Sequence, residues 1–425
     1  MKRSDARSLL EALNRSVGLL GSKRFGFFWF GSLLSNIGTW MQQVAEPWLV
    51  LSLSGSPILL GLDAFAMDAP IWVLTLVGGL LADRADRKRV ITFFQAIQMF
   101  CPLLLVLLIL TGWLKVWMII VLSLIVGITD ALSMPAFQSI VPLIVEPEKI
   151  GNAIALNSTQ FNLSRIFGPV LAGLVMAKYG AVGCFATNAL SYLPFLLVIS
   201  WIRLPRKSAE PSRSESFEAR PWYSEFHKIA SEPVLRGALL TVFVTSLLGG
   251  PLVAFSPVLI KDVFRSDASH FGGALSAFGV GGLIGAIAIL GAGEKRSHAR
   301  LCSAAAILYG VVLVAVSFNP YLSVLSALLV LAGAALTASN ISANSLLQGV
   351  APDGVRGRVA SVYMLAMRGG LSLGNLMTGF SVHFLGVRHA LLLNGAVAIA
   401  LQIWTHLAWS AATEIKPILT SEVGN

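Results

Sequence analysis

The sequence predicts an all-α membrane protein with twelve transmembrane helices in two pseudo-symmetric bundles of six. Three observations support this prediction: the low charge, the block pattern of apolar residues and the placement of cations. Of the 425 residues, 56% are hydrophobic and only 12% are charged, whereas soluble domains carry about 25% charged residues. The apolar residues form blocks of about 20, the length that spans a bilayer. The cations cluster between these blocks, as cytoplasmic loops require.

The twelve spans are expected at 25–53, 58–82, 90–112, 116–141, 152–178, 181–203, 234–260, 268–290, 301–318, 321–348, 358–385 and 388–411. Helices are predicted because lipid does not tolerate unpaired backbone and because the blocks lack the alternation of a membrane barrel. The first 24 residues contain no long apolar stretch, so no cleaved secretory signal is expected.

The distribution of cations predicts the orientation. If the N-terminus is cytoplasmic, the outer junctions hold only Lys115, Lys178, Lys261, Arg265 and Arg388. Most other cations, including the cluster Arg84, Arg87, Lys88 and Arg89, then lie inside. This asymmetry predicts that both termini are cytoplasmic. It also accounts for the net charge of +10 without nucleic acid, for which the chain offers no basic helix or aromatic platform.

A hydrophilic segment between 203 and 236 divides the chain into two halves. We expect a cytoplasmic N-terminal segment (1–24), a six-helix bundle (25–203), a cytoplasmic linker (204–233), a second bundle (234–411) and a cytoplasmic tail (412–425). Within the linker, Trp222, Phe226 and Ile229 share one helical face, which is typical of a short helix on the membrane surface. An ordinary loop is the alternative.

A weak internal repeat supports the two halves. Residues 145–157 resemble residues 350–362, and each stretch joins the fourth helix of its half to the fifth. The cationic loop after the second span is echoed by residues 293–300. Repeats of this kind are typical of transporters, whose substrate site lies near the midplane.

The stretch 78–90 ends the second span with an anion followed by cations. Gly79 would let another helix approach closely, and Asp83 would suit the positive end of a neighbouring helix. The stretch resembles the loop motif of the major facilitator superfamily, Gly-x-Leu-x-Asp-Arg-x-Gly-Arg-Lys. The matching residues are Gly79, Leu81, Asp83, Arg84, Arg87 and Lys88.

That resemblance implies a conformational latch on the cytoplasmic side. Asp83 would bond near the start of the eleventh span, around residues 357–359. Asp86 stands where the family usually has glycine. It either adds a second anion to the latch or is simply tolerated.

Residues 134–173 and 225–239 narrow the resemblance to the enterobactin-exporter-like branch, the transmembrane secretion effectors. The branch implies bacterial plasma-membrane exporters of drugs, siderophores or other amphipathic metabolites.

Gly168, Pro169 and Gly173 are similar to the second half of the antiporter motif of the fifth helix, although the upstream glycines are absent. A proline in mid-helix bends the helix, so this segment is either a hinge or a static kink. The arginine of the family's fourth helix is also absent, and that helix carries Asp130 instead.

Charged residues within the spans are the main candidates for function, because each costs at least about 2.5 kcal/mol at the bilayer centre. They are Glu46, Asp63, Asp68, Asp130, Arg165 and Arg368. Asp63 lies near a helix end, where water would solvate it. We expect Glu46, Asp68 or Asp130 to carry a coupled proton, since burial disfavours an ionised carboxyl. Arg165 or Arg368 would neutralise an acid or meet an anionic substrate.

Two polar stripes accompany these charges. The first span places Asn36, Thr39, Gln43 and Glu46 on one face, and the tenth places Thr337, Asn340, Asn344 and Gln348 on one face. Such stripes must face protein or water. In the family these helices line the central cavity, so the stripes are expected to line it too. The alternative is hydrogen bonding between helices.

The sequence contains no catalytic or cofactor motif. None of the six histidines forms a His-Glu-x-x-His pair or a Cys/His cluster, and no phosphate-binding Gly-x-x-x-x-Gly-Lys loop occurs. No metal or cofactor is expected. The function predicted is that of a secondary active transporter, a monomer that exports an amphipathic small molecule against protons by alternating access. Uptake of a solute, flipping of a lipid, and a non-transporting receptor or scaffold are the alternatives.

Overall fold

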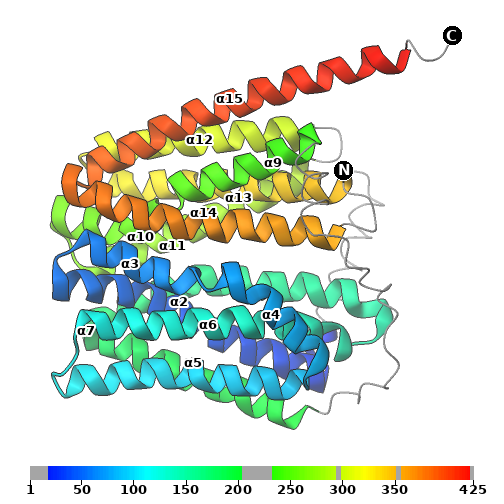
Figure 1. Cartoon of the computed structure of the whole chain (residues 1–425). Helices are drawn as coiled ribbons and strands as arrows, with labels where there is room; N and C mark the ends of the chain where they lie inside the picture. Colours follow the sequence, from blue (N-terminus) through cyan, green and yellow to red (C-terminus); the bar gives the residue numbers. More distant parts are fainter. Residues whose placement is uncertain (1–17, 203–231, 293–297, 351–355, 422–425) are drawn as a thin grey trace. The chain divides into compact units, whose positions relative to one another are not determined.

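The computed structural model describes residues 18–202, 232–292, 298–350 and 356–421. Within these ranges every regular element is a helix (Figure 1). The linker residues Trp222, Phe226 and Ile229, for which a surface helix is predicted, lie outside the described residues.

The first six predicted spans correspond to α2 (Lys23–Ser54), α3 (Pro57–Asp68), α4 (Ile71–Arg84), α5 (Arg87–Leu110), α6 (Val116–Ile140) and α7 (Ile150–Trp201). The second span is broken, since α3 ends before Ala69 and Pro70 and α4 begins after them. The fifth and sixth spans are both contained in α7, where Gly180 has a φ of 65°. Glycine adopts this left-handed conformation without steric cost, so α7 consists of two helices joined at Gly180.

The last six predicted spans begin with a composite helix: α9 (Pro233–Val244), a π-helical segment η3 (Thr245–Gly249), α10 (Pro251–Val258) and a second π-helical segment η4 (Leu259–Val263). The others are α11 (Ala268–Ala292), α12 (His298–Phe318), α13 (Leu322–Val350), α14 (Arg356–Leu385) and α15 (Val387–Ser421).

Nine segments of the described chain are long and apolar enough to cross a membrane. One of them, Pro147–Trp201, contains 55 residues and accommodates two spans. The helices α2 and α14 are 32 and 30 residues long but are more polar. With these two included, each of the twelve predicted spans matches a helix or a composite of helical segments.

The contacts group the chain into two units. Unit 1 comprises Met1–Gly55, Ala69–Arg206 and Asp267–Ser276, and unit 2 comprises Ser56–Asp68, Lys207–Ser266 and Ala277–Asn425. Each unit therefore includes a short segment from the opposite half of the sequence. The division into domains at residues 203 and 234 stays a prediction.

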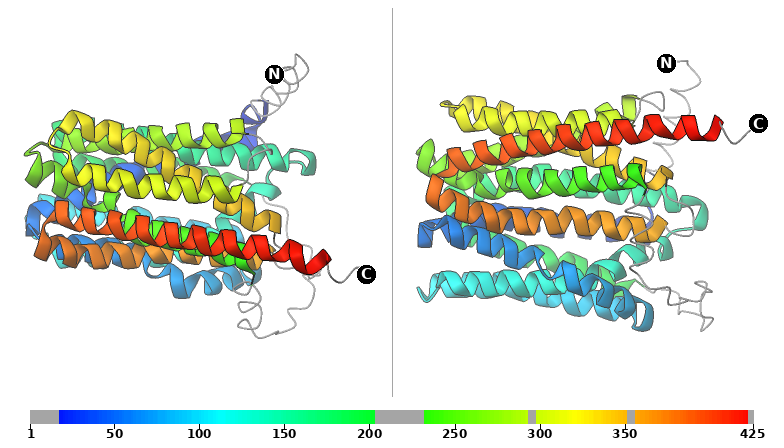
Figure 2. Two further views of the ribbon diagram at one scale, coloured as in Figure 1. Left: turned by 90° about the horizontal axis from the view of Figure 1, so that it is seen from above. Right: turned by 45° about the horizontal axis from the view of Figure 1, so that its top comes forward.

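Small residues allow close helix packing inside each unit. In unit 1, Gly31 and Gly38 of α2 lie against the backbone of Phe195 and Asn188 of α7. In unit 2, α12 and α15 lie side by side in both views of Figure 2, and Gly310 approaches Gly395 at their crossing. Lipid offers no hydrophobic drive for helix association, so such close contacts supply much of the packing energy.

Candidate functional site

Glu46 is the centre of a polar network inside unit 1. It lies in the C-terminal half of α2 and is only 9% exposed. Its Oε1 accepts a hydrogen bond from Oγ of Ser123 on α6 at 2.6 Å, and its Oε2 accepts one from Nε2 of Gln42 at 2.7 Å. Oε1 of Gln42 in turn accepts from Nδ2 of Asn188 on α7 at 2.6 Å. The network therefore ties the carboxyl group to three helices.

The sequence predicted Glu46 but missed the other three members of this network. Gln42 lies one turn before Glu46, and this spacing of four is a recognisable signal for a contact on a helix. Ser123 and Asn188 lie on other helices, and only the packing of α2, α6 and α7 brings Ser123 to Glu46 and Asn188 to Gln42. The predicted neighbour Gln43 is exposed instead, so Gln42 takes the position next to the acid.

Asp68 and Arg368 form an ion pair inside unit 2. Nη1 of Arg368 on α14 lies 2.6 Å from Oδ1 of Asp68, the last residue of α3. The Asp68 side chain is 12% exposed and the Arg368 side chain 30%. The sequence predicted that Arg165 or Arg368 either neutralises an acid or meets an anionic substrate, and the structure brings Arg368 together with Asp68. Asp63 lies on the same helix and is only 4% exposed. It is therefore buried, whereas the sequence predicted that water would solvate it near a helix end.

Arg165 lies beside an aromatic group in unit 1. Its guanidinium carbon is 5.8 Å from the centre of the Trp40 ring, which is within the range of a cation–π interaction. Phe161, one turn before Arg165 on α7, meets Trp40 edge to face at 5.9 Å. Asp130 of α6 is half-buried.

The residues of the two predicted polar stripes differ in how far they are exposed. Asn36 of α2 and Asn340 of α13 are half-buried, and Gln43 and Asn344 are exposed. The backbone oxygen of Asn340 accepts from the Tyr363 hydroxyl at 3.5 Å. Its side-chain Oδ1 is buried with no hydrogen-bond partner among the described residues. Whether the stripes line a cavity stays a prediction.

The loop motif differs from the expectation at Gly79, and Asp86 has a contact that the sequence did not predict. A Cβ added to Gly79 would meet no atom within 4 Å, whereas one added to Gly78 would lie 2.6 Å from the carbonyl oxygen of Ala131. The close approach of a helix, predicted at Gly79, is therefore at Gly78. Asp86 is the N-cap of α5, because its Oδ1 accepts from the backbone N–H groups of Lys88 at 2.9 Å and Arg89 at 3.4 Å. Glycine is also a good N-cap, which explains why aspartate can stand in its place.

The cations of the loop motif differ in their contacts and in their exposure. Nζ of Lys88 donates to the carbonyl oxygens of Ser200 and Ile202 at 2.6 and 3.0 Å, which places a positive charge at the carboxyl end of α7. Arg84 is exposed and Arg87 is half-buried with a partner of its own. The side chain of Asp83 and residues 351–358 lie outside the described side chains, so the latch stays a prediction.

The segment around Pro169 is tightly packed. A Cβ at Gly168 would overlap the Cβ of Trp40 on α2. At Gly173, a Cβ would lie 3.2 Å from the carbonyl oxygen of Ser269, and one at Gly272 would lie 2.7 Å from the carbonyl oxygen of Pro169. The helices α7 and α11 thus cross backbone to backbone within unit 1. Both the hinge and the static kink remain compatible with this crossing.

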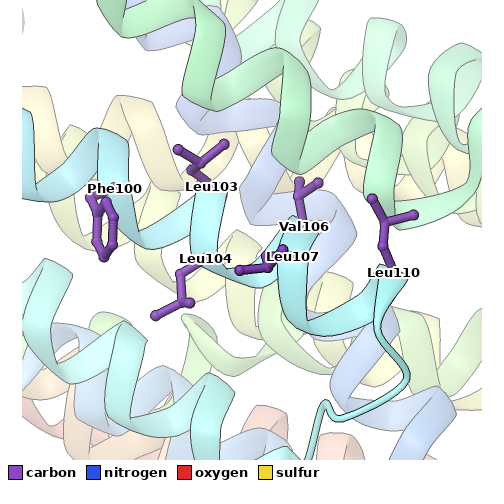
Figure 3. Close-up of a pocket in the computed structure, with 6 residues that line it drawn as sticks. All are labelled: Phe100, Leu103, Leu104, Val106, Leu107 and Leu110. Atoms are coloured by element: carbon purple, nitrogen blue, oxygen red, sulfur yellow. The ribbon is translucent and has the colours of Figure 1, made fainter.

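The described part of the chain includes an apolar hollow on α5 and a second hollow in unit 2. The first, about 310 Å³, is lined only by α5 residues: Phe100, Leu103, Leu104, Val106, Leu107 and Leu110 (Figure 3). Four of these, Phe100, Leu103, Leu107 and Leu110, are at least 50% exposed, so this is an apolar surface suited to acyl chains. The second, about 210 Å³, lies between η3, α14 and α15 and includes the hydrogen-bonded pair Asn394 and Thr378. No cluster that could hold a metal occurs among the described side chains.

A helical architecture with charged groups buried in its spans is typical of membrane transporters. The solved structure of a bacterial homologue of the human lysosomal transporter Spinster matches with a TM-score of 0.73 at 15% identity, covering 92% of this chain and 98% of that one. A model of the transmembrane secretion effector family matches residues 16–417. The chain therefore belongs to the transmembrane secretion effectors of the major facilitator superfamily, and the predicted fold and family are confirmed.

Several relatives of this chain are transporters of named compounds. The staphyloferrin A transporter of Staphylococcus aureus is 24% identical over 367 residues, covering 85% of this chain and 90% of that protein. The multidrug efflux pump Tap of Mycolicibacterium fortuitum is 27% identical over 396 residues, covering 88% and 94%. The enterobactin exporter EntS of Shigella boydii is 25% identical over 252 residues, covering 57% and 58%. The chain is thus a multi-pass membrane transporter of small molecules and not an enzyme.

Proposed function

We propose that this protein exports an amphipathic small molecule in exchange for protons, by alternating access, from the bacterial cytoplasm. It acts as a monomer in the plasma membrane with both termini in the cytoplasm. Export is supported by the relatives, which include a multidrug efflux pump and an enterobactin exporter. The positive charges of the predicted inner loops support the orientation.

Proton coupling is supported by one geometric feature of Glu46. The hydroxyl of Ser123 lies 2.6 Å from Oε1 of Glu46 and 3.0 Å from the carbonyl oxygen of Ile119. A hydroxyl has one proton to donate and two lone pairs to accept with. When Glu46 is ionised, Ser123 donates to it. When Glu46 is protonated, Glu46 donates to Ser123, and Ser123 turns its proton to Ile119.

The second carboxyl oxygen also keeps a partner in both states, because Nε2 of Gln42 can donate to a carboxylate or to the carbonyl oxygen of a carboxylic acid. Glu46 can therefore gain and lose a proton without leaving a buried polar atom unpaired, which would cost about 1–3 kcal/mol. Neither protonation state of Glu46 loses a hydrogen bond relative to the other. A group that must bind and release protons requires such a balance.

The test begins with drug-susceptibility and metabolite-secretion profiles of a deletion strain, to find a transported compound. Uptake of that compound into everted vesicles is then measured with and without a protonophore. We expect wild-type uptake to collapse with the protonophore and Glu46→Gln to lose the proton-driven part. The matched control is Glu148→Gln, which changes an exposed acid in the short 3₁₀ turn directly before α7. Full proton-driven uptake by Glu46→Gln would refute the role of Glu46.

The same vesicles separate the alternatives. Accumulation only in right-side-out vesicles would indicate an uptake carrier, and movement of a labelled lipid between leaflets would indicate a flippase. No flux of any compound, with Glu46→Gln indistinguishable from wild type in the cell, would indicate a receptor or scaffold.

A further inference from the structure

The hollow of about 210 Å³ between η3, α14 and α15, here called the crevice, has an apolar rim. Three of its lining residues, Met377, Leu393 and Val397, are exposed. Exposed apolar side chains that lie together on a surface mark a contact with another molecule or with a membrane. In a multi-pass membrane protein, this rim faces the acyl chains of the bilayer.

The floor of the crevice is polar. Asn394 of α15 is only 7% exposed and Thr378 of α14 only 2%, and Nδ2 of Asn394 donates to Oγ1 of Thr378 at 2.9 Å. Among the described residues, Oδ1 of Asn394 has no hydrogen-bond donor and the Thr378 hydroxyl has no acceptor for its proton. The pair therefore offers an unused acceptor and an unused donor inside the crevice.

This polar pair lies at the depth of the acyl chains. Asn394 is the eighth residue of α15 and Thr378 the eighth from the end of α14, so both are about 10 Å along the helices from the turn at Gly386. Phe384 and Leu385 lie nearer to that turn and are exposed apolar residues. Acyl chains have no hydrogen-bonding group, and an unsatisfied polar group is costly in lipid. A partner for the pair must therefore come from another molecule.

The third wall of the crevice is the π-helical segment η3, which contributes two leucine side chains. Segments of this kind are rare and often occur at functional sites. The Tyr309 hydroxyl holds one end of η3, since it donates to the carbonyl oxygen of Gly249 at 2.9 Å. Nε2 of Gln402 holds the other end and donates to Oγ1 of Thr245 at 3.1 Å. A wall whose shape is fixed in this way lowers the cost of ordering a ligand against it.

We propose that the crevice binds an amphipathic molecule that carries a hydroxyl group on a long apolar body and that enters from the bilayer. A hydroxyl suits the polar pair because a single oxygen can donate to Oδ1 of Asn394 and accept from Thr378. An ether or ester oxygen can only accept, and an ammonium group can only donate. The apolar body lies along the rim. This site belongs to unit 2 and is separate from Glu46, which belongs to unit 1.

The test is photolabelling of the purified full-length protein in lipid nanodiscs. The probe is a long-chain primary alcohol with a diazirine in its chain. The matched probe is the methyl ether of the same alcohol, which cannot donate a hydrogen bond. Labelled peptides are identified and quantified by mass spectrometry. The hollow on α5 is the internal control, because all of its lining side chains are apolar (Figure 3).

We expect the alcohol to label the crevice about tenfold more than the ether, a factor that corresponds to about 1.4 kcal/mol and lies within the range of one or two hydrogen bonds. Both probes should label the α5 hollow equally. Asn394→Leu and Thr378→Val should each lower crevice labelling by the alcohol to the level of the ether. Ser381→Ala is the matched control and should change nothing, since Ser381 lines the crevice but donates to the carbonyl oxygen of Met377.

Val397→Phe, which fills the crevice, should reduce its labelling by both probes, and thermal unfolding confirms that each variant is folded. Equal labelling of the crevice by alcohol and ether would overturn the proposal and would indicate that water alone satisfies the polar pair. Undiminished alcohol labelling in folded Asn394→Leu and Thr378→Val would also overturn it. Since no transport is measured, these outcomes are distinct from a failure of proton coupling.

Discussion

Nζ of Lys88, in the first turn of α5, lies 2.6 Å from the carbonyl oxygen of Ser200 near the end of α7. The last carbonyl groups of a helix lack partners within the helix and carry partial negative charge. Lys88 therefore supplies both a donor and a positive charge at the point where α7 ends. This residue of the motif has a structural contact in addition to any part in a latch.

Lys88→Met is expected to lower stability by about 1 kcal/mol, because the end of α7 loses a charged hydrogen bond. Thermal unfolding of the purified protein in detergent measures this loss. Arg84→Met removes an exposed cation of the same loop and is expected to have little effect. Equal effects of the two changes would show that the contact with α7 contributes nothing.

The N-cap of α5 leads to a second prediction. Asp86→Ala is expected to lower stability by about 1 kcal/mol, whereas Asp86→Asn and Asp86→Gly should change it by only a few tenths, since asparagine and glycine are also good N-caps. The same thermal unfolding measurement ranks the three variants. If Asp86 acted chiefly as a second anion of the latch, all three variants would lose transport without this order of stability.

The Ser123 hydroxyl is predicted to be needed for proton coupling. Ser123→Ala leaves Oε1 of Glu46 without its α6 donor, a loss of about 1.5–3 kcal/mol for a charged hydrogen bond. We expect proton-driven uptake in everted vesicles to fall by about tenfold, since each 1.4 kcal/mol is a factor of ten. Ser133→Ala is the matched control on α6, because Ser133 donates to the backbone of Asp130. Identical uptake by the two variants would contradict the prediction.

The crossing of α7 and α11 is predicted to be sterically sensitive. Gly272→Ala would place a Cβ 2.7 Å from the carbonyl oxygen of Pro169, whereas Gly273→Ala would meet nothing within 4 Å. We expect Gly272→Ala to cost about 1–3 kcal/mol, the usual penalty of overpacking, and Gly273→Ala to be neutral or slightly stabilising. Thermal unfolding and uptake are measured for both variants. A neutral Gly272→Ala would mean that the helices separate easily here.

A final prediction concerns pH and Asp267, which precedes α11. Hydrogen bonds from the Ser269 hydroxyl and from the ring and backbone of His270 hold the pKa of Asp267 well below its usual range. A depressed pKa stabilises the folded protein above the unfolded value, about 3.9, and this contribution is lost as pH falls towards the folded value. Asp267→Asn should therefore flatten the stability curve below about pH 4. Thermal unfolding between pH 2 and 6, roughly the range over which carboxyl groups titrate, measures both curves. Parallel curves for variant and wild type would contradict this assignment.

Much of the architecture could be predicted because it depends on composition along the chain. Blocks of about 20 apolar residues can only be membrane helices, and each predicted span has its helix. The break in the second span at Pro70 and the bend at Gly180 could have been anticipated from their residue types. The apolar pattern alone shows two separate blocks on either side of Gly180 and does not show that a single glycine joins them. The π-helical segments η3 and η4 have no sequence signal of their own.

The sequence by itself determined the class of the protein, the number of spans and which charged residues lie within the spans, because lipid penalises a buried charge and few such residues occur. Only the tertiary structure decided which of these charges meet. It paired Asp68 with Arg368 across 300 positions of the chain, and it gave Glu46 the partners Gln42 and Ser123 in place of the expected stripe. The physical reason is that a hydrogen bond depends on a few tenths of an ångström between side chains of different helices, and helix rotation and crossing are set by the packing of glycines and apolar side chains elsewhere in each unit.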